Sequence, residues 1–383
     1  MKSRKADEAV VLILDPRGLL SNENSSSIKR HKTYAEELFK KNRLKLVAIS
    51  SSKYSTYTNF ESNDFCIYYV SKPTFNFIVF AIKAALLVSK KSFKVKLIIV
   101  GDPWESYWSA YFFRRIIRCI AMIQIQLHGD FGNPSWRRMN IKSRIRYFFL
   151  RFSITPNNYF RTVSLPQLNY FVKNFKADPL KSVIVPVPIS SFSPFRSYKF
   201  GNPRTIGFIG RIQQDRGLNE FIDLIAKLSV GSKELELIIT GSGTETDKFL
   251  SKLEIFIPNS KIHYYGQLSE KELERIWIKI GVLVSTAPTE SYGRVMREAL
   301  VAGVPVWATP SSGVFDLSSK AGNKIVNILD LSKSSEDLCE QLEQLFHCKV
   351  PLGFRNNFII ENSTYSTLLI ESWIDLMNKQ HRF

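Results

Sequence analysis

The chain has 383 residues, of which 44% are hydrophobic and 23% are charged. These proportions exclude an intrinsically disordered or fibrous protein, and the length favours two domains. The four cysteines are widely separated, without CxxC pairs or a histidine cluster, which argues against a disulfide framework or a zinc site.

The net charge of +19 is concentrated in the first half of the chain. Residues 1–200 contain 33 Lys and Arg against 12 Asp and Glu, a net charge of +21, whereas residues 201–383 carry −2. Such an asymmetry indicates that the first half faces an anionic partner: a membrane surface, an anionic acceptor or nucleic acid. Nucleic acid is disfavoured, because no RRM, KH or helix-turn-helix signature occurs.

The N-terminal stretch is basic but has too few apolar residues before Asp15 for the core of a signal peptide. We therefore expect a cytoplasmic protein. Residues 75–88 are strongly apolar but are interrupted by Lys83, and a membrane span needs roughly 20 apolar residues. We expect this stretch to be a buried helix.

Short apolar runs, separated by helical stretches, recur through the first half of the chain. They cover residues 10–14, 45–50, 65–70, 96–102, 123–130 and 183–189. Runs that are rich in Val and Ile and alternate with helices are typical of a parallel sheet with helices on both faces.

The same alternation restarts after residues 190–204, a stretch rich in Ser, Pro and aromatic residues that we interpret as an interdomain linker. Its strands are expected in TIGFIG, LELIITGSG, KIHYYG, VLVSTAP and VPVWAT. The second half is therefore predicted to be a second α/β unit.

The segment 289–309, TESYGRVMREALVAGVPVWAT, carries the strongest functional signal. We expect a helix to open near Ser291, with Gly293 allowing a ligand to approach the backbone. Free amides at a helix start bind phosphate. Glu290 and Glu298 lie eight residues apart, so on a regular helix they would share nearly one face and reach one ligand.

This segment resembles glycosyltransferase family 4, whose members are retaining enzymes of the GT-B fold with a Glu-x7-Glu element. Residues 206–228 resemble the Gly-Arg...Lys-Gly segment of the family, with Arg216 where Lys is usual. Arg keeps the positive charge of Lys, but it presents this charge on a planar guanidinium instead of a compact ammonium group. Residues 237–245 resemble the second strand and glycine turn of the donor-binding domain. The resemblance covers the second half well and the first half thinly.

The resemblance implies a role for each matching residue. Glu298 would bind the ribose of a nucleotide sugar, Glu290 the hydroxyls of the sugar, and the two arginines the diphosphate. Fixed cations and helix amides stabilise the charge that grows on such a leaving group. The implied donor-binding residues are Gly18, Arg211, Arg216, Gly241, Tyr292, Gly293, Arg294 and Glu298. No Asp-x-Asp metal motif occurs, and we expect no cofactor.

Two residues of the first half are further candidates beside Glu290 for catalysis. His128 and Asp130 end an expected strand, where α/β sheets bind ligands, and the family often has a His there. A single His in this position can equally be a structural hydrogen-bonding residue. Retention of the anomeric configuration is compatible with two mechanisms. In one, a leaving phosphate oxygen takes the proton of the acceptor; in the other, Glu290 is a covalent nucleophile.

The implied architecture is GT-B: two Rossmann-like parallel-sheet domains that face each other across a cleft. We place an acceptor-binding domain at 1–192, a linker at 193–204, a nucleotide-sugar-binding domain at 205–362, and a helix that crosses back to the first domain at 363–383. The expected activity moves a sugar from a UDP- or GDP-sugar to a lipid-linked or cell-surface polysaccharide acceptor.

Two basic amphipathic stretches, 111–120 and 141–152, suggest that the first domain docks on the inner face of an anionic membrane. Their apolar residues could equally pack on the sheet. Three other interpretations of the function stay open: a GT-B nucleotide-sugar epimerase, an inactive relative of the family, and a non-catalytic protein that binds a membrane or nucleic acid.

Overall fold

The structure is a computed structural model that describes residues 8–20, 26–52, 59–71, 77–189, 203–231, 235–258 and 261–380. The chain divides into two compact units. The first unit consists of Met1–His128, Arg144–Pro186 and Thr364–Phe383, and the second of Gly129–Ser143 and Val187–Ser363. Residues 193–202 of the predicted linker lie outside the described residues.

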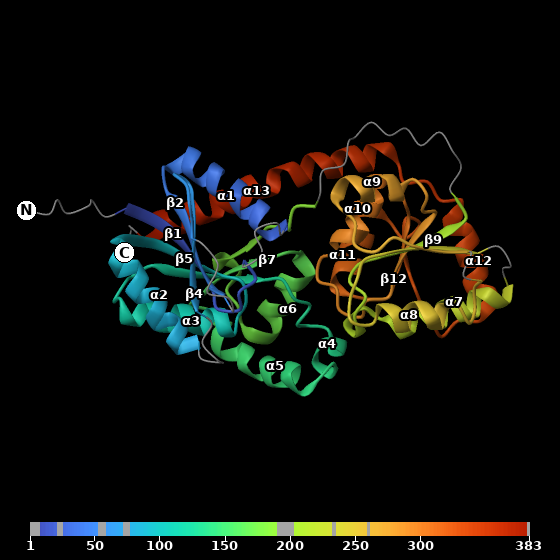
Figure 1. Cartoon of the computed structure of the whole chain (residues 1–383), viewed down its shortest axis with the longest axis horizontal. Helices are drawn as coiled ribbons and strands as arrows, with labels where there is room; N and C mark the ends of the chain where they lie inside the picture. Colours follow the sequence, from blue (N-terminus) through green and yellow to red (C-terminus); the bar gives the residue numbers. More distant parts are fainter. Residues whose placement is uncertain are drawn as a thin grey trace, which may run out of the picture. The chain divides into compact units, whose positions relative to one another are not determined.

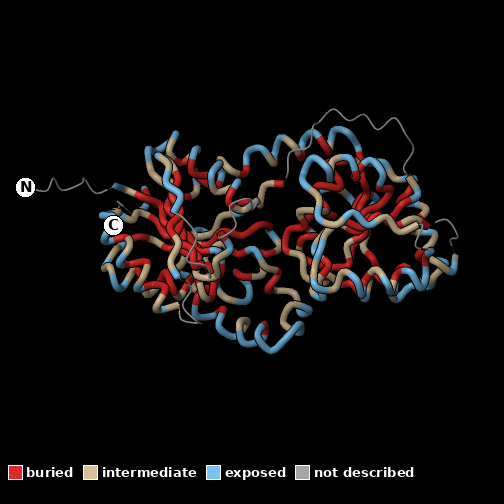
Figure 2. The backbone as a smooth tube through the Cα atoms, in the orientation of Figure 1, coloured by how far each residue is buried: buried red, intermediate tan, exposed pale blue. Residues whose placement is uncertain are grey.

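The first unit is built on an eight-stranded sheet in the order β3-β4-β2-β1-β5-β6-β7-β8, in which only β3 is antiparallel to its neighbour. Figure 2 shows these strands as a buried layer. The strands are β1 (Glu8–Asp15), β2 (Lys45–Ser52), β3 (Phe60–Glu61), β4 (Phe65–Ser71), β5 (Phe93–Val100), β6 (Met122–Leu127), β7 (Tyr159–Thr162) and β8 (Ser182–Ile184).

Helices cover both faces of this sheet (Figure 1). The helices of the first half of the chain are α1 (Ser26–Asn42), α2 (Phe77–Lys91), α3 (Glu105–Ile116), α4 (Pro134–Arg138), α5 (Ile141–Ser153) and α6 (Leu165–Phe175), with a short η1 (Pro179–Lys181). On one face, Leu38 of α1 and Trp373 of α13 (Leu352–Gln380) share a core with Val11 and Ile13 of β1. The opposite face is covered by α2 and α3.

The described part of the apolar stretch at 75–88, residues 77–88, forms most of α2, as predicted. Phe80, Ala84 and Val88 lie on its buried face, whereas Leu86 is exposed. None of the helices among the described residues combines the length and the apolar composition that a membrane crossing requires.

The second unit is built on a parallel sheet in the order β11-β10-β9-β12-β13-β14. Its strands are β9 (Thr205–Ile209), β10 (Glu236–Thr240), β11 (Ile262–Tyr264), β12 (Val282–Ser285), β13 (Val306–Ala308) and β14 (Val326–Ile328). Its helices are η2 (Gln214–Arg216), α7 (Leu218–Gly231), α8 (Thr246–Leu253), α9 (Glu270–Trp277), α10 (Arg294–Ala302), α11 (Ser312–Ala321) and α12 (Ser335–Phe346). Phe221 of α7, Phe249 of α8 and Leu342 of α12 pack on this sheet in one core.

The prediction of two parallel α/β sheets is confirmed, with local differences. β3, β7 and β14, which have two to four residues each, were not predicted. The run at 183–189 forms only the three-residue β8, since prolines at 186 and 188 cannot donate to a strand ladder. The expected helix at 111–120 ends at Ile116.

Candidate active site

A cavity of about 300 Å³ lies at the carboxyl edge of the second sheet. Its walls come from the end of β9, the end of β12, the following turn and the first residues of α10. Ligands of α/β proteins bind at this edge. Five residues predicted from the sequence line the cavity: Arg211, Arg216, Glu290, Gly293 and Arg294.

The turn before α10 differs from the expectation in one respect. The helix begins at Arg294, and Gly293 is its N-cap with a φ of 72°. Glu290 therefore precedes the helix, and its Oε1 accepts a hydrogen bond of 3.1 Å from the backbone N–H of Gly293. The prediction that Glu290 and Glu298 share one helical face is wrong, because the left-handed Gly293 interrupts the helical path between them.

The Arg216 guanidinium lies at 3.1 Å from Glu290 Oε2, so the two charges that the resemblance assigns to donor binding form an ion pair here. Gly217 holds this arginine in place. Its φ is 69°, and a Cβ at this position would lie 1.9 Å from the carbonyl oxygen of Thr286. The Thr286 hydroxyl donates to the carbonyl of Gly217 over 2.7 Å, which fixes the loop after β9 against the end of β12.

Glu298 is more deeply placed than Glu290. It is only 5% exposed and is absent from the walls of the cavity. Its Oε1 lies 3.4 Å from Arg294 Nη2, and Arg294 does line the cavity. A ligand in the cavity therefore meets the Arg294 side chain, and the carboxylate of Glu298 lies behind it.

Arg211 is the most accessible of the predicted cations. Its side chain is 56% exposed and makes an ion pair of 3.3 Å with Asp215, four residues further along the chain. An exposed pair of this kind contributes little to stability. The arginine can therefore exchange this partner for an anionic ligand at low cost.

Gly241 and Tyr292 make structural contacts within the second unit. Gly241 has a φ of 122°, and a Cβ there would lie 1.8 Å from the carbonyl oxygen of Gly210, so the two loops after β9 and β10 touch through their backbones. Tyr292 is 3% exposed, and the guanidinium of Arg297 lies 3.7 Å from the centre of its ring.

Arg297 was not predicted, although it stands next to Glu298. It is fully buried and forms an ion pair of 2.6 Å with Asp316 of α11. The pair and the stacked Tyr292 ring connect the turn before α10 to α11. A buried arginine in a helix cannot be recognised from sequence, since most arginines on helices are solvated.

Asp130 also belongs to the second unit, through the segment Gly129–Ser143. Its Oδ1 accepts a hydrogen bond of 2.5 Å from the hydroxyl of Ser312, and its Oδ2 accepts from the Ser312 backbone N–H and from Asn133. Asn133 also donates to the carbonyl of Pro288 over 2.7 Å. Burial raises the pKa of Asp130, while these hydrogen bonds act in the opposite direction. The carboxylate thus fastens its own segment to the start of α11.

Gly18 and His128 lie in the first unit, at the carboxyl edge of its sheet. Gly18 has a φ of 75°, and a Cβ there would lie 2.4 Å from the carbonyl oxygen of Ser51, so only glycine fits this loop without strain. The exposed His128 places Nε2 at 3.2 Å from Gln126 Oε1.

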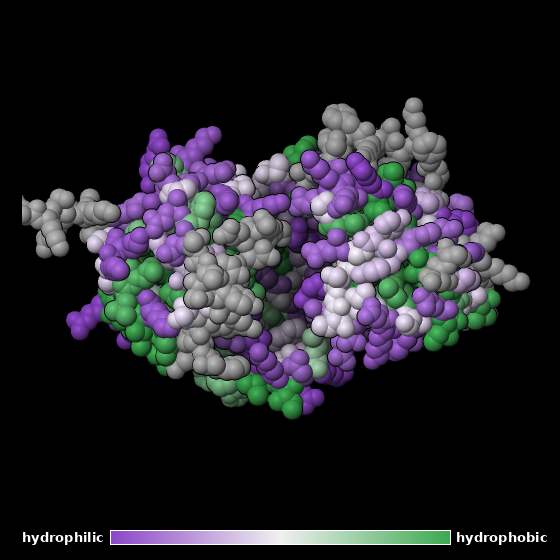
Figure 3. Space-filling model, viewed as in Figure 1, coloured by the Kyte–Doolittle hydropathy of each residue, from purple (hydrophilic) through white to green (hydrophobic). Residues whose placement is uncertain are grey.

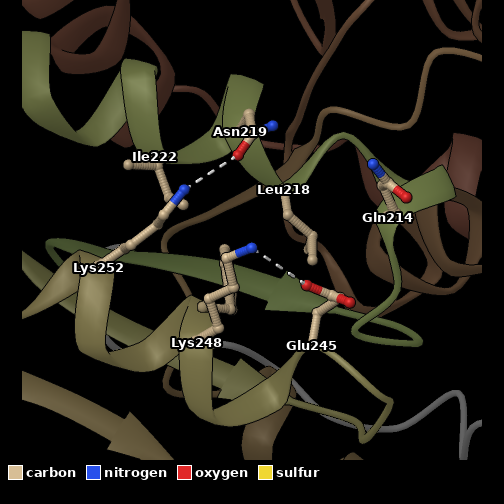
Figure 4. A pocket seen from close by; sticks show the side chains of 8 residues that line it. Gln214, Leu218, Asn219, Ile222, Glu245, Lys248 and Lys252 are labelled. Carbon is tan, nitrogen blue, oxygen red and sulfur yellow. Dashed lines mark hydrogen bonds and ion pairs between the residues drawn. The ribbon is translucent and has the colours of Figure 1, made fainter.

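A second hollow, of about 190 Å³, lies between α7 and α8 (Figure 4). It contains none of the residues predicted from the sequence. Its lysines are exposed and already have partners: Lys252 donates to Asn219 over 3.5 Å, and Lys248 lies 4.0 Å from Glu245. The cavity at the end of β9 is therefore the better candidate for a reaction site.

Comparison with known proteins shows which family the second half of the chain resembles. Residues 191–363 match the family described as glycosyl transferases group 1. The chain is 25% identical over 126 residues to a 2-deoxystreptamine glucosyltransferase of Streptomyces kanamyceticus, covering 32% of this chain and 33% of the relative. It is 27% identical over 112 residues to a GDP-mannose-dependent alpha-mannosyltransferase of Mycobacterium tuberculosis, covering 29% of this chain and 27% of the relative.

Among solved structures, the fold is similar to that of WaaG, a glycosyltransferase involved in lipopolysaccharide biosynthesis. The TM-score is 0.58 at 13% sequence identity, with 94% of this chain and 96% of WaaG covered. The matched stretches span about a third or less of the two curated relatives, whereas the structural likeness extends over nearly the whole chain. The protein therefore has the GT-B fold, and its residues 191–363 match the group 1 glycosyl transferases.

Proposed function

We propose that the protein is a retaining glycosyltransferase that uses a nucleotide sugar. The observation that carries the proposal is the cavity at the carboxyl edge of the second sheet, in which Arg211, Arg216, Glu290 and the amides at the start of α10 converge. It lies inside the region that matches the group 1 glycosyl transferases.

In this proposal the cations act on the leaving group. When the bond between the sugar and the diphosphate breaks, negative charge grows on the phosphate oxygens. Arg211 and Arg216 lie near the end of β9 and would supply positive charge to these oxygens. In the structure Arg216 is paired with Glu290. Donor binding would break this ion pair, so that Arg216 contacts the diphosphate and Glu290 contacts the sugar.

Glu290 would accept hydrogen bonds from the sugar hydroxyls, and Glu298 from the ribose. Because Glu298 lies behind Arg294, the ribose would reach it only as the arginine side chain shifts. The leaving phosphate oxygen would then take the proton of the acceptor hydroxyl on the same face of the sugar. The alternative, a covalent bond to Glu290, requires that its carboxylate leave Arg216 and Gly293.

The acceptor is proposed to be a lipid-linked or cell-surface glycan, reached from an anionic membrane surface on the cytoplasmic side. The basic first half of the chain and the exposed apolar side chains of α5 support this proposal. WaaG, with the same fold, is involved in lipopolysaccharide biosynthesis. UDP and GDP both remain candidate nucleotides.

The experiment that tests the function is incubation with a panel of radiolabelled nucleotide sugars, scored for transfer, hydrolysis and epimerisation. Release of nucleoside diphosphate, together with a product in which the transferred sugar keeps its anomeric configuration, supports a retaining transferase. Conversion of the sugar to its epimer without transfer would instead support the GT-B epimerase, which needs no basic acceptor surface.

Arg211→Ala sharpens this test. Loss of a preorganised cation at the leaving group is expected to lower the rate by about 10² to 10³. The matched control is Lys248→Ala, an exposed cation of the second hollow, which should leave the rate within a factor of two or so. Activity of the Arg211 variant close to that of the parent, in protein with unchanged circular dichroism, would place the phosphate site elsewhere.

A further inference from the structure

Arg294 is the first residue of α10, and it carries a positive charge at the end of the helix that disfavours one. The helix dipole makes the N-terminus of a helix partly positive, so acidic residues are preferred there. The first turn of α10, all of which the structure describes, contains no acidic residue. An anion beside the Arg294 side chain would therefore relieve an unfavourable arrangement of charge.

The walls of the cavity at the end of β9 carry more positive than negative charge. Among the described residues that line it, Arg211, Arg216 and Arg294 are cations and Glu290 is the carboxylate. The Nε atoms of Arg216 and Arg294 are buried and have no hydrogen-bond partner among the described residues. A buried donor that lacks an acceptor costs free energy, so these atoms indicate a ligand with acceptor oxygens.

Two of these arginines are each paired with a glutamate of the sequence motif. Arg216 Nη1 lies 3.1 Å from Glu290 Oε2, and Arg294 Nη2 lies 3.4 Å from Glu298 Oε1. The Arg294 side chain is 36% exposed and lines the cavity, whereas the Glu298 side chain is 7% exposed. A pair at 3.4 Å is long for a charge-assisted hydrogen bond, so Arg294 can leave this carboxylate for a better acceptor.

A ligand can replace both members of the pair between Arg294 and Glu298 only if it carries two kinds of group. Hydroxyls would donate to the carboxylate of Glu298, and an anion would accept from the guanidinium of Arg294. Hydroxyls alone displace the arginine without giving it a new partner, and an anion alone takes the arginine away from a buried carboxylate. Separating a buried charge from its partner is costly, so the pair favours a ligand that supplies both groups.

We propose that the side chain of Arg294 is a specificity-determining residue that leaves Glu298 to bind the diphosphate, while the ribose hydroxyls take its place on Glu298. The binding of diphosphate and the binding of ribose are thereby coupled, because each releases the partner that the other needs. This inference rests on the proposed function in naming the ligand a sugar donor. The coupling itself concerns any nucleoside diphosphate that binds in the cavity.

The test measures the binding of uridine and guanosine to the full chain by ligand-detected NMR, with and without inorganic diphosphate. In the parent chain, saturating diphosphate should raise the affinity for the nucleoside by about threefold, because it draws Arg294 away from Glu298. In Arg294→Met the nucleoside alone should bind about threefold more tightly than it binds to the parent. Diphosphate should then add nothing, since this variant has no arginine to release.

Calorimetry with UDP and GDP gives the second measurement. Their affinity for Arg294→Met should fall by about tenfold, because the diphosphate loses a cation. The variant therefore changes the affinities for nucleoside and for nucleoside diphosphate in opposite directions, whereas a damaged site would lower both. Arg275→Met, at an exposed arginine of α9, is the matched control and should change neither.

Arg294→Gln repeats both measurements with a neutral polar side chain, in case the circular dichroism of the Met variant is altered. Equal losses of affinity for nucleoside and nucleoside diphosphate would overturn the inference and leave Arg294 with a structural role. Unchanged affinities would overturn it as well.

The outcome is independent of the transfer assay. Opposite changes of the two affinities, in a protein that does not react with any nucleotide sugar, would refute the proposed function alone. Sugar transfer by a parent chain in which diphosphate and nucleoside bind without coupling would refute the role of Arg294 alone.

Discussion

Glu290 and Glu298 belong to one sequence motif but lie in different surroundings. Glu290 lines the cavity and pairs with Arg216, whereas Glu298 is 5% exposed and pairs with Arg294. The motif could be recognised from sequence, but this difference could not. It depends on Gly293, whose left-handed backbone delays the start of the helix.

The two glutamates should respond differently to the same substitution. Glu298→Gln is expected to weaken nucleotide binding by roughly tenfold to a hundredfold, because one charge-assisted hydrogen bond is worth about 1.5 to 3 kcal/mol. Glu290→Gln should mainly lower turnover. Calorimetry with the nucleoside diphosphate and steady-state rates separate the two effects, and an unchanged affinity in the Glu298 variant would remove its ribose role.

The buried ion pair of Arg297 and Asp316 is expected to contribute to the free energy of unfolding. Arg297→Met leaves the carboxylate of Asp316 buried without its closest partner, which should cost about 3 to 5 kcal/mol. Urea unfolding measures this loss. The double variant Arg297→Met/Asp316→Leu removes both charges and should recover most of the stability. If both variants unfold at the same urea concentration, the pair has no special role.

The sequence predicts the four charged residues around the cavity, together with Gly293, but few of their contacts. Arg211, Arg216 and Arg294 were found because they belong to local motifs with fixed spacing. The bonds of Asp130 to Ser312, and of Arg297 to Asp316, join segments that no local pattern connects. The functional roles of His128 and Asp130 stay predictions, although Asp130 is seen to be occupied by hydrogen bonds within its own unit.

At the scale of elements, α3 and α5 have different surroundings despite similar sequences. Phe113 of α3 is fully buried against the sheet, as expected of an ordinary surface helix. On α5, by contrast, Leu150 is buried but five other apolar residues face solvent: Ile141, Ile145, Phe148, Phe149 and Phe152 are each between 44% and 73% exposed. In Figure 3 hydrophobic atoms, interspersed with hydrophilic ones, are visible where Figure 1 shows α5.

This difference predicts which helix docks on a membrane. Replacement of Phe148 and Phe149 by Ser should lower binding to anionic liposomes by about tenfold or more, since each buried CH₂ contributes about 0.8 kcal/mol. Ile116→Ser on α3, another exposed apolar position, is the matched control and should bind like the parent. Sedimentation at low and high salt gives the comparison, because the basic component of binding weakens as salt screens it.

Equal and negligible sedimentation of the parent chain with anionic and neutral liposomes would contradict a membrane role for α5. A soluble anionic glycan would then be the better explanation of the basic first half.

At the scale of the whole molecule, His31 couples stability to pH. Burial lowers the pKa of His31 from 6.5 to about 4, opposed by a hydrogen bond to the Ser27 carbonyl and assisted by the charge of Arg30. The unfolded chain therefore takes up this proton first as the pH falls. The stability that the folded protein has with a neutral His31 is fully present above pH 6.5, and it is lost progressively between pH 6.5 and pH 4.

Thermal unfolding of the parent and of His31→Gln at a series of pH values measures this effect. The expected loss for the parent between pH 7 and pH 4.5 is on the order of 1 to 2 kcal/mol more than for the variant, allowing for the partly accessible ring. Parallel stability curves for the two proteins would show that His31 does not titrate differently in the folded state.

Neither compact unit is a continuous stretch of chain, and this has a consequence for the order in which the protein folds. The core of the first unit includes Leu369, Ile370 and Trp373, and the indole of Trp373 donates to Gln124 of β6. A nascent chain growing at about 5 to 20 residues per second thus leaves the N-terminal sheet without its last covering helix until residue 373 has left the ribosome. Until then the part of that sheet that α13 covers in the folded protein stays open to chaperones, so translation rate and chaperone supply should govern the yield of native protein.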